Sequence, residues 1–128
     1  MYYIGIMTGN SLDAVDVVIT DFEDDIKDIC AHSIPIPQHI ADSFRILKND
    51  IKSANGDIVK VYNNDKIKFL SLHDEYIKIV AQTVNQTIKK ANLKKEDIKA
   101  IGFHGQTCYH NPPSINTDNP NTLQIGSG

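Results

Sequence analysis

The start of the chain constrains its fold most strongly. An apolar run over residues 2–7 ends at the small polar segment 8–11 (TGNS), and a second apolar run follows over 14–22. Val15 and Val17 alternate with their neighbours as in a half-buried strand. The pattern predicts a strand, a tight turn and a second strand. The turn could simply connect the two strands of an ordinary β-hairpin. Alternatively, its backbone N–H groups could bind phosphate oxygens.

The rest of the chain predicts a layered α/β domain. Further strands and helices are expected at residues 26–36 (strand), 41–51 (helix), 71–91 (long helix) and 98–103 (buried strand). Ser71 is the expected N-cap of the long helix, and residues 63–65 are expected to form a loop or helix break. A Pro/Asn-rich loop is expected over 110–121. A β-meander followed by helices and another strand is the order of an α/β domain.

Composition limits the classes of function. With 128 residues, 41% of them hydrophobic and 23% charged, the chain matches one soluble globular domain. Its formal net charge is −3, so no basic field attracts nucleic acid or a membrane surface. No apolar run approaches the ~20 residues of a membrane helix, and the residues after Met1 do not resemble a signal peptide. We therefore expect a cytoplasmic protein without nucleic-acid or membrane partners.

A second cluster of polar residues follows the predicted strand 98–103. His104, Gln106 and Thr107 lie just beyond its carboxyl end, where open α/β sheets usually bind ligands. His104 is suited to proton transfer or to a sugar hydroxyl, and the other two are suited to neutral polar recognition. Equally, His104 could cap the strand end while Gln106 satisfies loop backbone.

Two further chemistries are weaker alternatives. His104 and His110 could form a metal pair, but their spacing is unusual and no acid accompanies them closely. Cys108 could act as a nucleophile beside a histidine, as in a cysteine hydrolase. Cys30 and Cys108 form no CxxC motif, so free buried thiols are the favoured interpretation.

Two separated segments together resemble the signatures of the anhydro-N-acetylmuramic acid kinase family. Residues 5–16 (GIMTGNSLDAVD) look like its N-terminal signature. Residues 101–107 (IGFHGQT), with His110, Pro112 and 122–126 (TLQIG), resemble its second signature. The match is specific because both segments occur in the right order with a long helix between them.

This resemblance implies an α/β fold of the actin-like ATPase superfamily, which is ribonuclease H-like and includes sugar kinases and Hsp70. Residues 1–128 would be the N-terminal lobe, a β-meander plus helices, of a two-lobed sugar kinase that continues after Gly128. The family uses ATP and water to open the 1,6-anhydro ring of anhydro-N-acetylmuramic acid and to phosphorylate O6. The products are N-acetylmuramic acid 6-phosphate and ADP, and the setting is peptidoglycan recycling in the bacterial cytoplasm.

The resemblance also assigns site residues. The turn that contacts the ATP phosphates would comprise Gly9, Asn10, Ser11, Leu12, Asp13, Ala14, Val15 and Asp16. The sugar cleft would be near His104, Gly105, Gln106 and Thr107. Asp13 and Asp16 are expected to hold Mg²⁺ through its waters. The catalytic residue, an aspartate base, is expected beyond Gly128, in the C-terminal lobe that would be a partner of this one.

Departures from the family pattern keep other functions open. The family usually has Ser-Gly-Thr where this chain has residues 8–10 (TGN), and usually has glycine where it has Ala14. Asn10 lacks the threonine hydroxyl, and Ala14 adds a methyl group where close approach is needed. The alternatives are a degenerate, non-catalytic actin-like module that serves as a subunit or interaction partner, and a kinase for a different sugar. A homodimer is also open.

Overall fold

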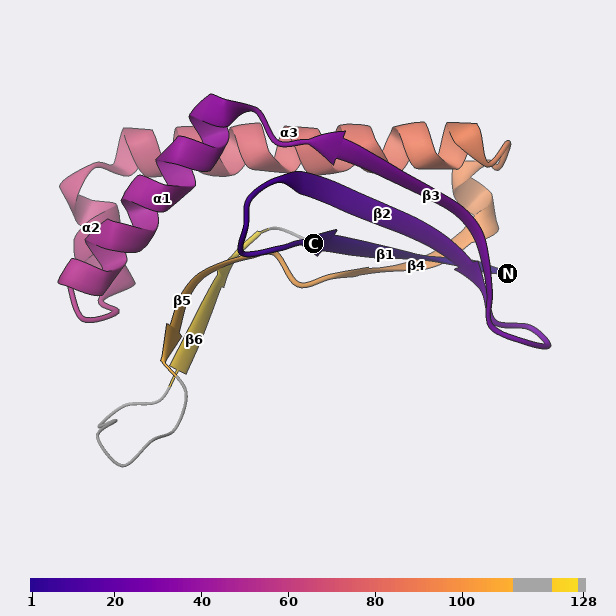
Figure 1. Cartoon of the computed structure of the whole chain (residues 1–128), viewed down its shortest axis with the longest axis horizontal. Coiled ribbons are helices and arrows are strands. Elements are labelled where there is room, and N and C mark those ends of the chain that lie inside the picture. The colour runs from indigo at the N-terminus through magenta and orange to yellow at the C-terminus, as the bar shows by residue number, and fades with distance from the viewer. Residues whose placement is uncertain (112–120, 127–128) are drawn as a thin grey trace.

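A four-stranded mixed sheet forms the centre of the fold (Figure 1). The structure, a computed structural model, describes residues 1–111 and 121–126. The strands of the sheet are β1 (Tyr2–Thr8), β2 (Ala14–Asp21), β3 (Lys27–Pro35) and β4 (Ile98–Phe103). Their order is β3-β2-β1-β4. The first three form the predicted antiparallel meander, whereas β4 pairs with β1 in parallel.

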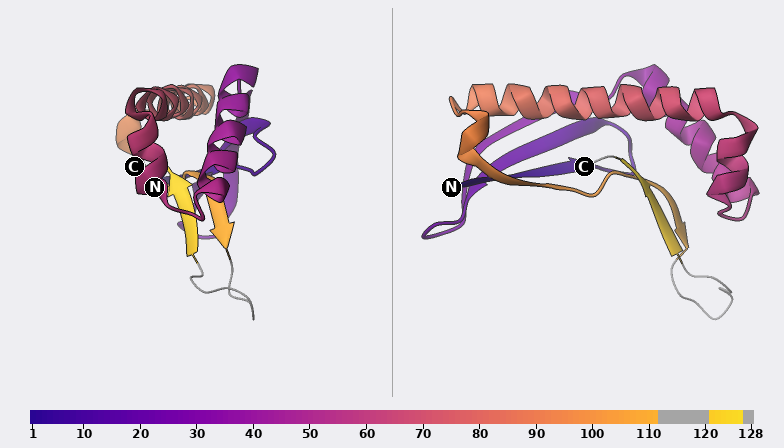
Figure 2. Two further views of the ribbon diagram at one scale, coloured as in Figure 1. Left: turned by 90° about the vertical axis from the view of Figure 1, so that its left-hand side faces the viewer. Right: turned by 180° about the vertical axis from the view of Figure 1, so that it is seen from behind.

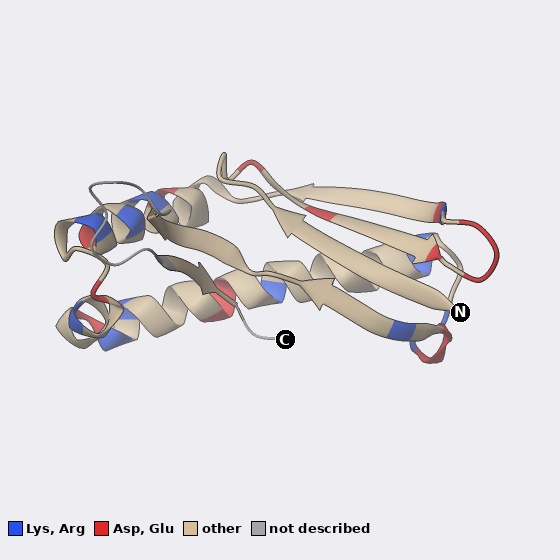
Figure 3. Ribbon diagram, turned by 90° about the horizontal axis from the view of Figure 1, so that it is seen from below, with Lys and Arg blue, Asp and Glu red and all other residues tan. Residues whose placement is uncertain are grey.

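The helices are placed differently: the longest lies along one face of the sheet, and the shorter ones lie beyond one end of it (Figures 1 and 2). They are α1 (Gln38–Ser53), α2 (Ile58–Asn64) and α3 (Lys66–Lys90), and a short 3-10 turn, η1 (Lys95–Asp97), precedes β4. The long helix α3 runs along the sheet and contacts β2 and β3, while α1 crosses its first half. Among the described residues, no helix covers the opposite face (Figure 3). No helix of this part of the chain combines the length and apolar character needed to cross a membrane.

The hydrophobic core lies between the sheet and α3. The alternation predicted for the second strand is confirmed, because Val15, Val17 and Ile19 are all buried on the helical side. The ring of Tyr76 from α3 meets that of Phe44 from α1 edge-on, with the ring centroids 5.2 Å apart. This aromatic contact fixes both helices against the carboxyl end of β1.

The predicted start of the long helix at Ser71 is wrong. The helix begins at Lys66, and Asp65 is its N-cap, with the Asp65 Oδ1 atom accepting a hydrogen bond from the Lys68 backbone N at 3.0 Å. Ser71 lies inside the helix. The predicted break over 63–65 is therefore confined to Asp65, which separates α2 from α3. An aspartate carboxylate caps a helix as well as serine does, and here it comes earlier in the chain.

The segment after β4 also differs from expectation. The loop predicted over 110–121 is wrong at both ends, because β5 (Gln106–Asn111) pairs with β6 (Asn121–Ile125) in a second, two-stranded antiparallel sheet. This hairpin projects away from the end of the main sheet (Figure 1). The pairing supplies backbone partners that sequence patterning alone does not reveal. The remainder of the predicted loop, residues 112–120, lies outside the described residues, as does Pro112.

The cap of α3 gives a direct test of this fold. Asp65→Ala should lower the free energy of unfolding by ~1 kcal/mol, because it removes the acceptor for the first helical turn. Asp65→Asn should retain most of that stability, since asparagine caps equally well. Urea unfolding measures all three proteins. Ser71→Ala is the control and should change stability by less than ~0.5 kcal/mol; a larger loss at Ser71 than at Asp65 would contradict the assigned start.

Candidate functional site

The two signature segments meet at one edge of the sheet. Because β1 and β4 are parallel, with Ile6 paired to Phe103, their carboxyl ends lie side by side. The residues that follow are Gly9 after β1 and His104 after β4. Segments nearly a hundred residues apart are in direct contact there, as the hydrogen bond from Thr8 Oγ1 to the Gly105 carbonyl demonstrates. The carboxyl edge of parallel strands is the usual place for a ligand in α/β sheets.

The first signature forms the predicted tight turn. The Leu12 backbone N donates a hydrogen bond to the Gly9 carbonyl at 3.1 Å, and the Ile36 N donates to the Asp13 carbonyl at 2.9 Å. The first bond closes the turn, and the second holds it against Ile36, the residue after β3. The side chains of Asn10, Ser11 and Asp13 are exposed on its outer side. Short polar side chains there leave the backbone accessible to a ligand.

Leu12 holds this turn in an unusual conformation. Its φ angle is +57°, in the left-handed region that a bulky side chain rarely adopts. Its side chain is nevertheless only 3% exposed, inside the core cluster. Apolar burial therefore offsets the backbone cost and anchors the turn. Strain of this kind is often found at functional sites.

Gln106 contacts the turn from its buried side. It is fully buried, and its Nε2 lies 3.4 Å from the Gly9 carbonyl and 3.3 Å from the Thr107 carbonyl. Two carbonyl acceptors fix the amide orientation, since the reverse orientation would place oxygen against oxygen. The Oε1 atom is consequently left without a hydrogen-bond partner among the described residues. A buried acceptor of this kind is costly unless a water or a ligand supplies a donor.

Three exposed side chains form a row on the uncovered face of the sheet. Asp16 of β2 is paired with Met7 of β1, and the His104 Nε2 lies 3.1 Å from the Met7 Sδ. Asp16 and Met7 also line a shallow hollow of about 640 Å³. The row thus brings one residue of each predicted site, Asp16 and His104, to either side of the same methionine.

The two predicted metal sites, Asp13 with Asp16 and His104 with His110, differ in their geometry. Asp13 and Asp16 are both exposed carboxylates near the first turn, which suits water-mediated contact with a cation. His110 lies in β5 opposite Thr122, whereas His104 precedes that strand. Within residues 1–111 and 121–126, no group of three or more His, Cys, Asp or Glu side chains could hold a metal directly.

Cys108 does not have the properties of a nucleophile. Burial raises the pKa of its thiol to about 12, so the thiolate is scarce at neutral pH. The Cys108 Sγ donates a hydrogen bond to the Gln106 carbonyl at 3.4 Å. Both cysteines are free, as expected, although Cys30 is only half-buried. This geometry argues against a cysteine hydrolase.

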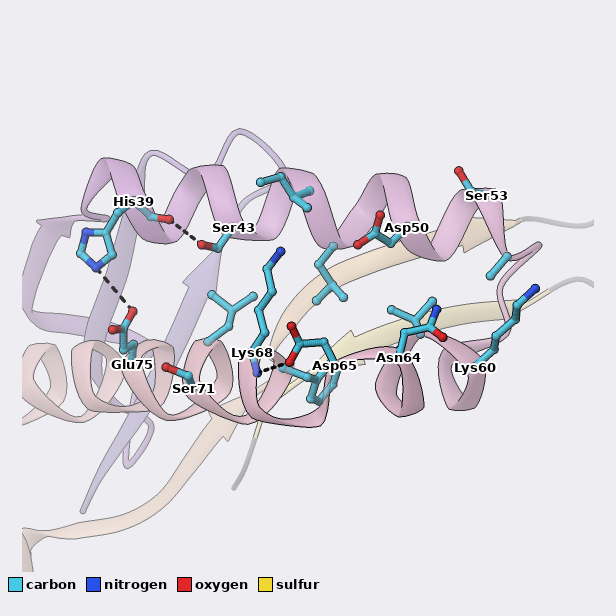
Figure 4. A pocket seen from close by; sticks show the side chains of 16 residues that line it. His39, Ser43, Asp50, Ser53, Lys60, Asn64, Asp65, Lys68, Ser71 and Glu75 are labelled. Carbon is cyan, nitrogen blue, oxygen red and sulfur yellow. Dashed lines mark hydrogen bonds and ion pairs between the residues drawn. The ribbon is translucent and has the colours of Figure 1, made fainter.

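A second hollow, of about 560 Å³, lies between α1 and the α2–α3 pair (Figure 4). Charged side chains from both walls point into it, including Asp50, Lys68 and Glu75 (Figure 4). The His39 Nε2 lies 3.4 Å from the Glu75 Oε2 across its mouth. None of the predicted site residues lines this hollow, so it is separate from the site at the sheet edge.

Sequence patterning did not identify Tyr76 as part of this site. Tyr76 occupies an apolar position of α3 that is indistinguishable in sequence from its core neighbours. Its hydroxyl lies 2.8 Å from the Thr8 Oγ1, immediately before the first turn. The only available signal was chemical: a tyrosine on a buried helix face needs a partner for its hydroxyl.

The chain is similar to known proteins of one family. The family model described as anhydro-N-acetylmuramic acid kinase matches residues 1–128. A protein named anhydro-N-acetylmuramic acid kinase from a Shewanella species (strain ANA-3) is 39% identical over 127 residues, and the one from Shewanella loihica is 35% identical. Each alignment covers 98% of this chain and 30% of the relative. The chain therefore spans less than a third of the length of the curated relatives it matches.

The raised pKa of the Cys108 thiol predicts that the protein loses stability at alkaline pH. Its pKa is raised from 9.0 to about 12, so the folded state keeps a proton that the unfolded state releases in this range. The stabilisation is present below pH 9.0 and is lost as the pH rises towards about 12. Urea unfolding of Cys108→Ser should therefore depend less steeply on pH across this window than unfolding of the wild type.

Cys30→Ser is the matched control for losing a thiol. The buried Tyr76 hydroxyl, whose pKa is also raised to about 12 by burial, keeps part of the alkaline slope in every variant. An unchanged slope in Cys108→Ser would contradict the assignment.

Proposed function

The chain belongs to the anhydro-N-acetylmuramic acid kinase family, and from this premise we propose that the full-length protein is an ATP-dependent kinase of that sugar. It uses ATP and water to open the 1,6-anhydro ring and phosphorylates O6, giving N-acetylmuramic acid 6-phosphate and ADP. The reaction takes place in the bacterial cytoplasm and recycles peptidoglycan sugar.

The meeting of the two signature segments is the observation that supports this proposal best. The turn after β1 and the segment after β4 share one edge of the sheet. Phosphoryl transfer depends on positioning and charge compensation more than on covalent chemistry. Two segments held together by β pairing and a buried amide provide such positioning for a phosphate and an acceptor hydroxyl.

In the proposed site, residues 9–16 contact the ATP phosphates. The exposed outer side of the turn, at Asn10 and Ser11, presents backbone N–H groups and short polar side chains. The turn is held in place by buried Leu12 from within. Asp13 and Asp16 would hold Mg²⁺ through its waters, and a bound ion would supply charge neutralisation for the phosphates.

Residues 104–107 serve the sugar side of the cleft in this proposal. His104 is exposed and hydrogen-bonds a sugar hydroxyl, while Gly105 and Thr107 shape the backbone around it. Gln106 is buried, so in this proposal it orders the sugar segment from within, and its Oε1 atom has no hydrogen-bond partner among the described residues. The same amide ties the sugar segment to the Gly9 carbonyl.

The partner of this lobe is a second, C-terminal lobe. The matched relatives are about three times as long as the aligned region, since it covers 30% of them. ATP and sugar bind between the two lobes, and the catalytic aspartate belongs to the second. The proposed homodimer stays a prediction.

The activity is tested in the full-length natural protein. ADP release should occur only when anhydro-N-acetylmuramic acid is present, and N-acetylmuramic acid 6-phosphate should accumulate in equal amount. The 128 residues alone should give no turnover, because the cleft needs both lobes. Turnover with glucose or glycerol instead would identify a kinase for a different sugar, and sugar-dependent ADP release by the 128 residues alone would contradict the division into lobes.

Titration with Mg·ATP separates a kinase from a degenerate module. The full-length wild type should bind saturably, and Asp16→Asn should weaken binding about fivefold or more because it removes a charged ligand to the hydrated ion. Asp21→Asn, at the far end of the same strand, is the matched control and should bind as the wild type does.

If the wild type fails to bind but the Asn10→Thr/Ala14→Gly variant binds, the departures from the family pattern have abolished the ATP site. That result would favour the non-catalytic module over the kinase.

A further inference from the structure

We propose that Tyr76 is a positioning residue that acts through Thr8 to set the phosphate-contacting turn against the sugar segment. The inference rests on the proposed function. It concerns a buried hydroxyl of α3 that neither signature segment contains. The three groups involved, the Tyr76 Oη, the Thr8 Oγ1 and the Gly105 carbonyl, are termed the hydroxyl bridge below.

The direction of the hydroxyl bridge follows from its last acceptor. The Thr8 Oγ1 lies 2.8 Å from the Tyr76 Oη and 3.3 Å from the Gly105 carbonyl oxygen. A carbonyl oxygen can only accept, so Thr8 donates to Gly105. The threonine hydroxyl has one proton, and Tyr76 must therefore donate to Thr8. The bridge joins α3, the end of β1 and the segment after β4.

Burial protects the hydroxyl bridge from solvent. Tyr76 is fully buried and Thr8 is 3% exposed, so water does not compete for these bonds. Burial also raises the pKa of Tyr76 to about 12, so its proton is retained throughout the physiological range. Removing one member would leave the others buried with an unmet hydrogen bond.

The position of the tyrosine hydroxyl is set by the core. The Tyr76 ring packs edge-on against Phe44 of α1 and lies 6.2 Å from the ring of Phe103 at the end of β4. These rings hold the phenol in one place between α1, α3 and the sheet. The end of β1 is therefore positioned by packed helices as well as by its neighbouring strands.

The hydroxyl bridge ends on a segment that cannot easily readjust. Gly105 has a φ angle of +77°, and a Cβ atom there would lie 2.6 Å from the Ile125 carbonyl oxygen. His104 precedes Gly105 and Gln106 follows it, so the bridge fixes the segment that contains both. Thr8 precedes Gly9, whose carbonyl receives the Gln106 amide. A shift of about 1 Å between such segments lowers the rate of a positioned reaction severely.

The test uses the full-length natural protein and steady-state kinetics. Tyr76→Phe keeps the ring and removes only the hydroxyl, and Thr8→Val removes the middle of the bridge. Both should raise the KM for ATP about fivefold or more. Thr8→Ser retains the hydroxyl and should stay within about twofold of the wild type. The Tyr76→Phe/Thr8→Val double variant should be no worse than Thr8→Val, because both remove one bridge.

Thr87→Val is the matched control. Thr87 is equally buried on α3, but its Oγ1 bonds the Thr83 carbonyl within the helix. It should leave the KM for ATP unchanged even where stability falls. A wild-type KM in Tyr76→Phe, or an equal rise in Thr87→Val, would overturn the inference.

A measurement that needs no turnover separates this inference from the proposed function. Absence of sugar-dependent ADP release by the wild type would refute the proposed function alone. In isotopically labelled protein, Tyr76→Phe should shift the backbone amide resonances of both Gly9 and Gly105, and Thr87→Val should shift neither. Unchanged Gly9 and Gly105 resonances in Tyr76→Phe would overturn the positioning role.

Discussion

The parallel pairing of β1 with β4 is the constraint on which the rest of the structure depends. Parallel neighbours cannot be joined by a short turn, so the chain must leave the sheet and return. It does so through the rest of the meander and the helices, of which α3 lies along one face of the sheet. The pairing also places the residues after both strands at one edge. The architecture of the core and the location of the candidate site thus have the same origin.

The turn over residues 9–13 divides the candidate site into two sides. Its outer side is exposed and polar, and the uncovered face beside it carries the row Asp16, Met7 and His104. Its inner side is buried and holds Leu12, Gln106 and the hydroxyl bridge. The outer side is accessible to ligands, whereas the inner side fixes the conformation of the turn that would bind them. A reaction that depends on positioning needs both.

Much of this arrangement was predictable from local patterns. The meander and the position of β4 followed from apolar alternation and from a short apolar run. The predicted burial of β4 is wrong, because it is an edge strand and its residues are exposed or half-buried in the part of the chain that the structure describes. The start of α3 was misplaced because Ser71 and Asp65 are both good caps, and only the hydrogen bond to the Lys68 N distinguishes them. The β5–β6 hairpin was missed because its stability comes from pairing and from packing against α1, not from propensity.

The sequence by itself determined the family, the α/β class and the identity of the residues in both signature segments, because these depend on residue type and order. Only the tertiary structure decided that the segments share an edge and that Tyr76 bonds Thr8. It also decided that Gln106 is buried, with an Oε1 atom that has no partner among the described residues. Each depends on contacts between residues far apart in the chain. Such contacts are set by the register of strands and the packing of helices, which local periodicity does not encode.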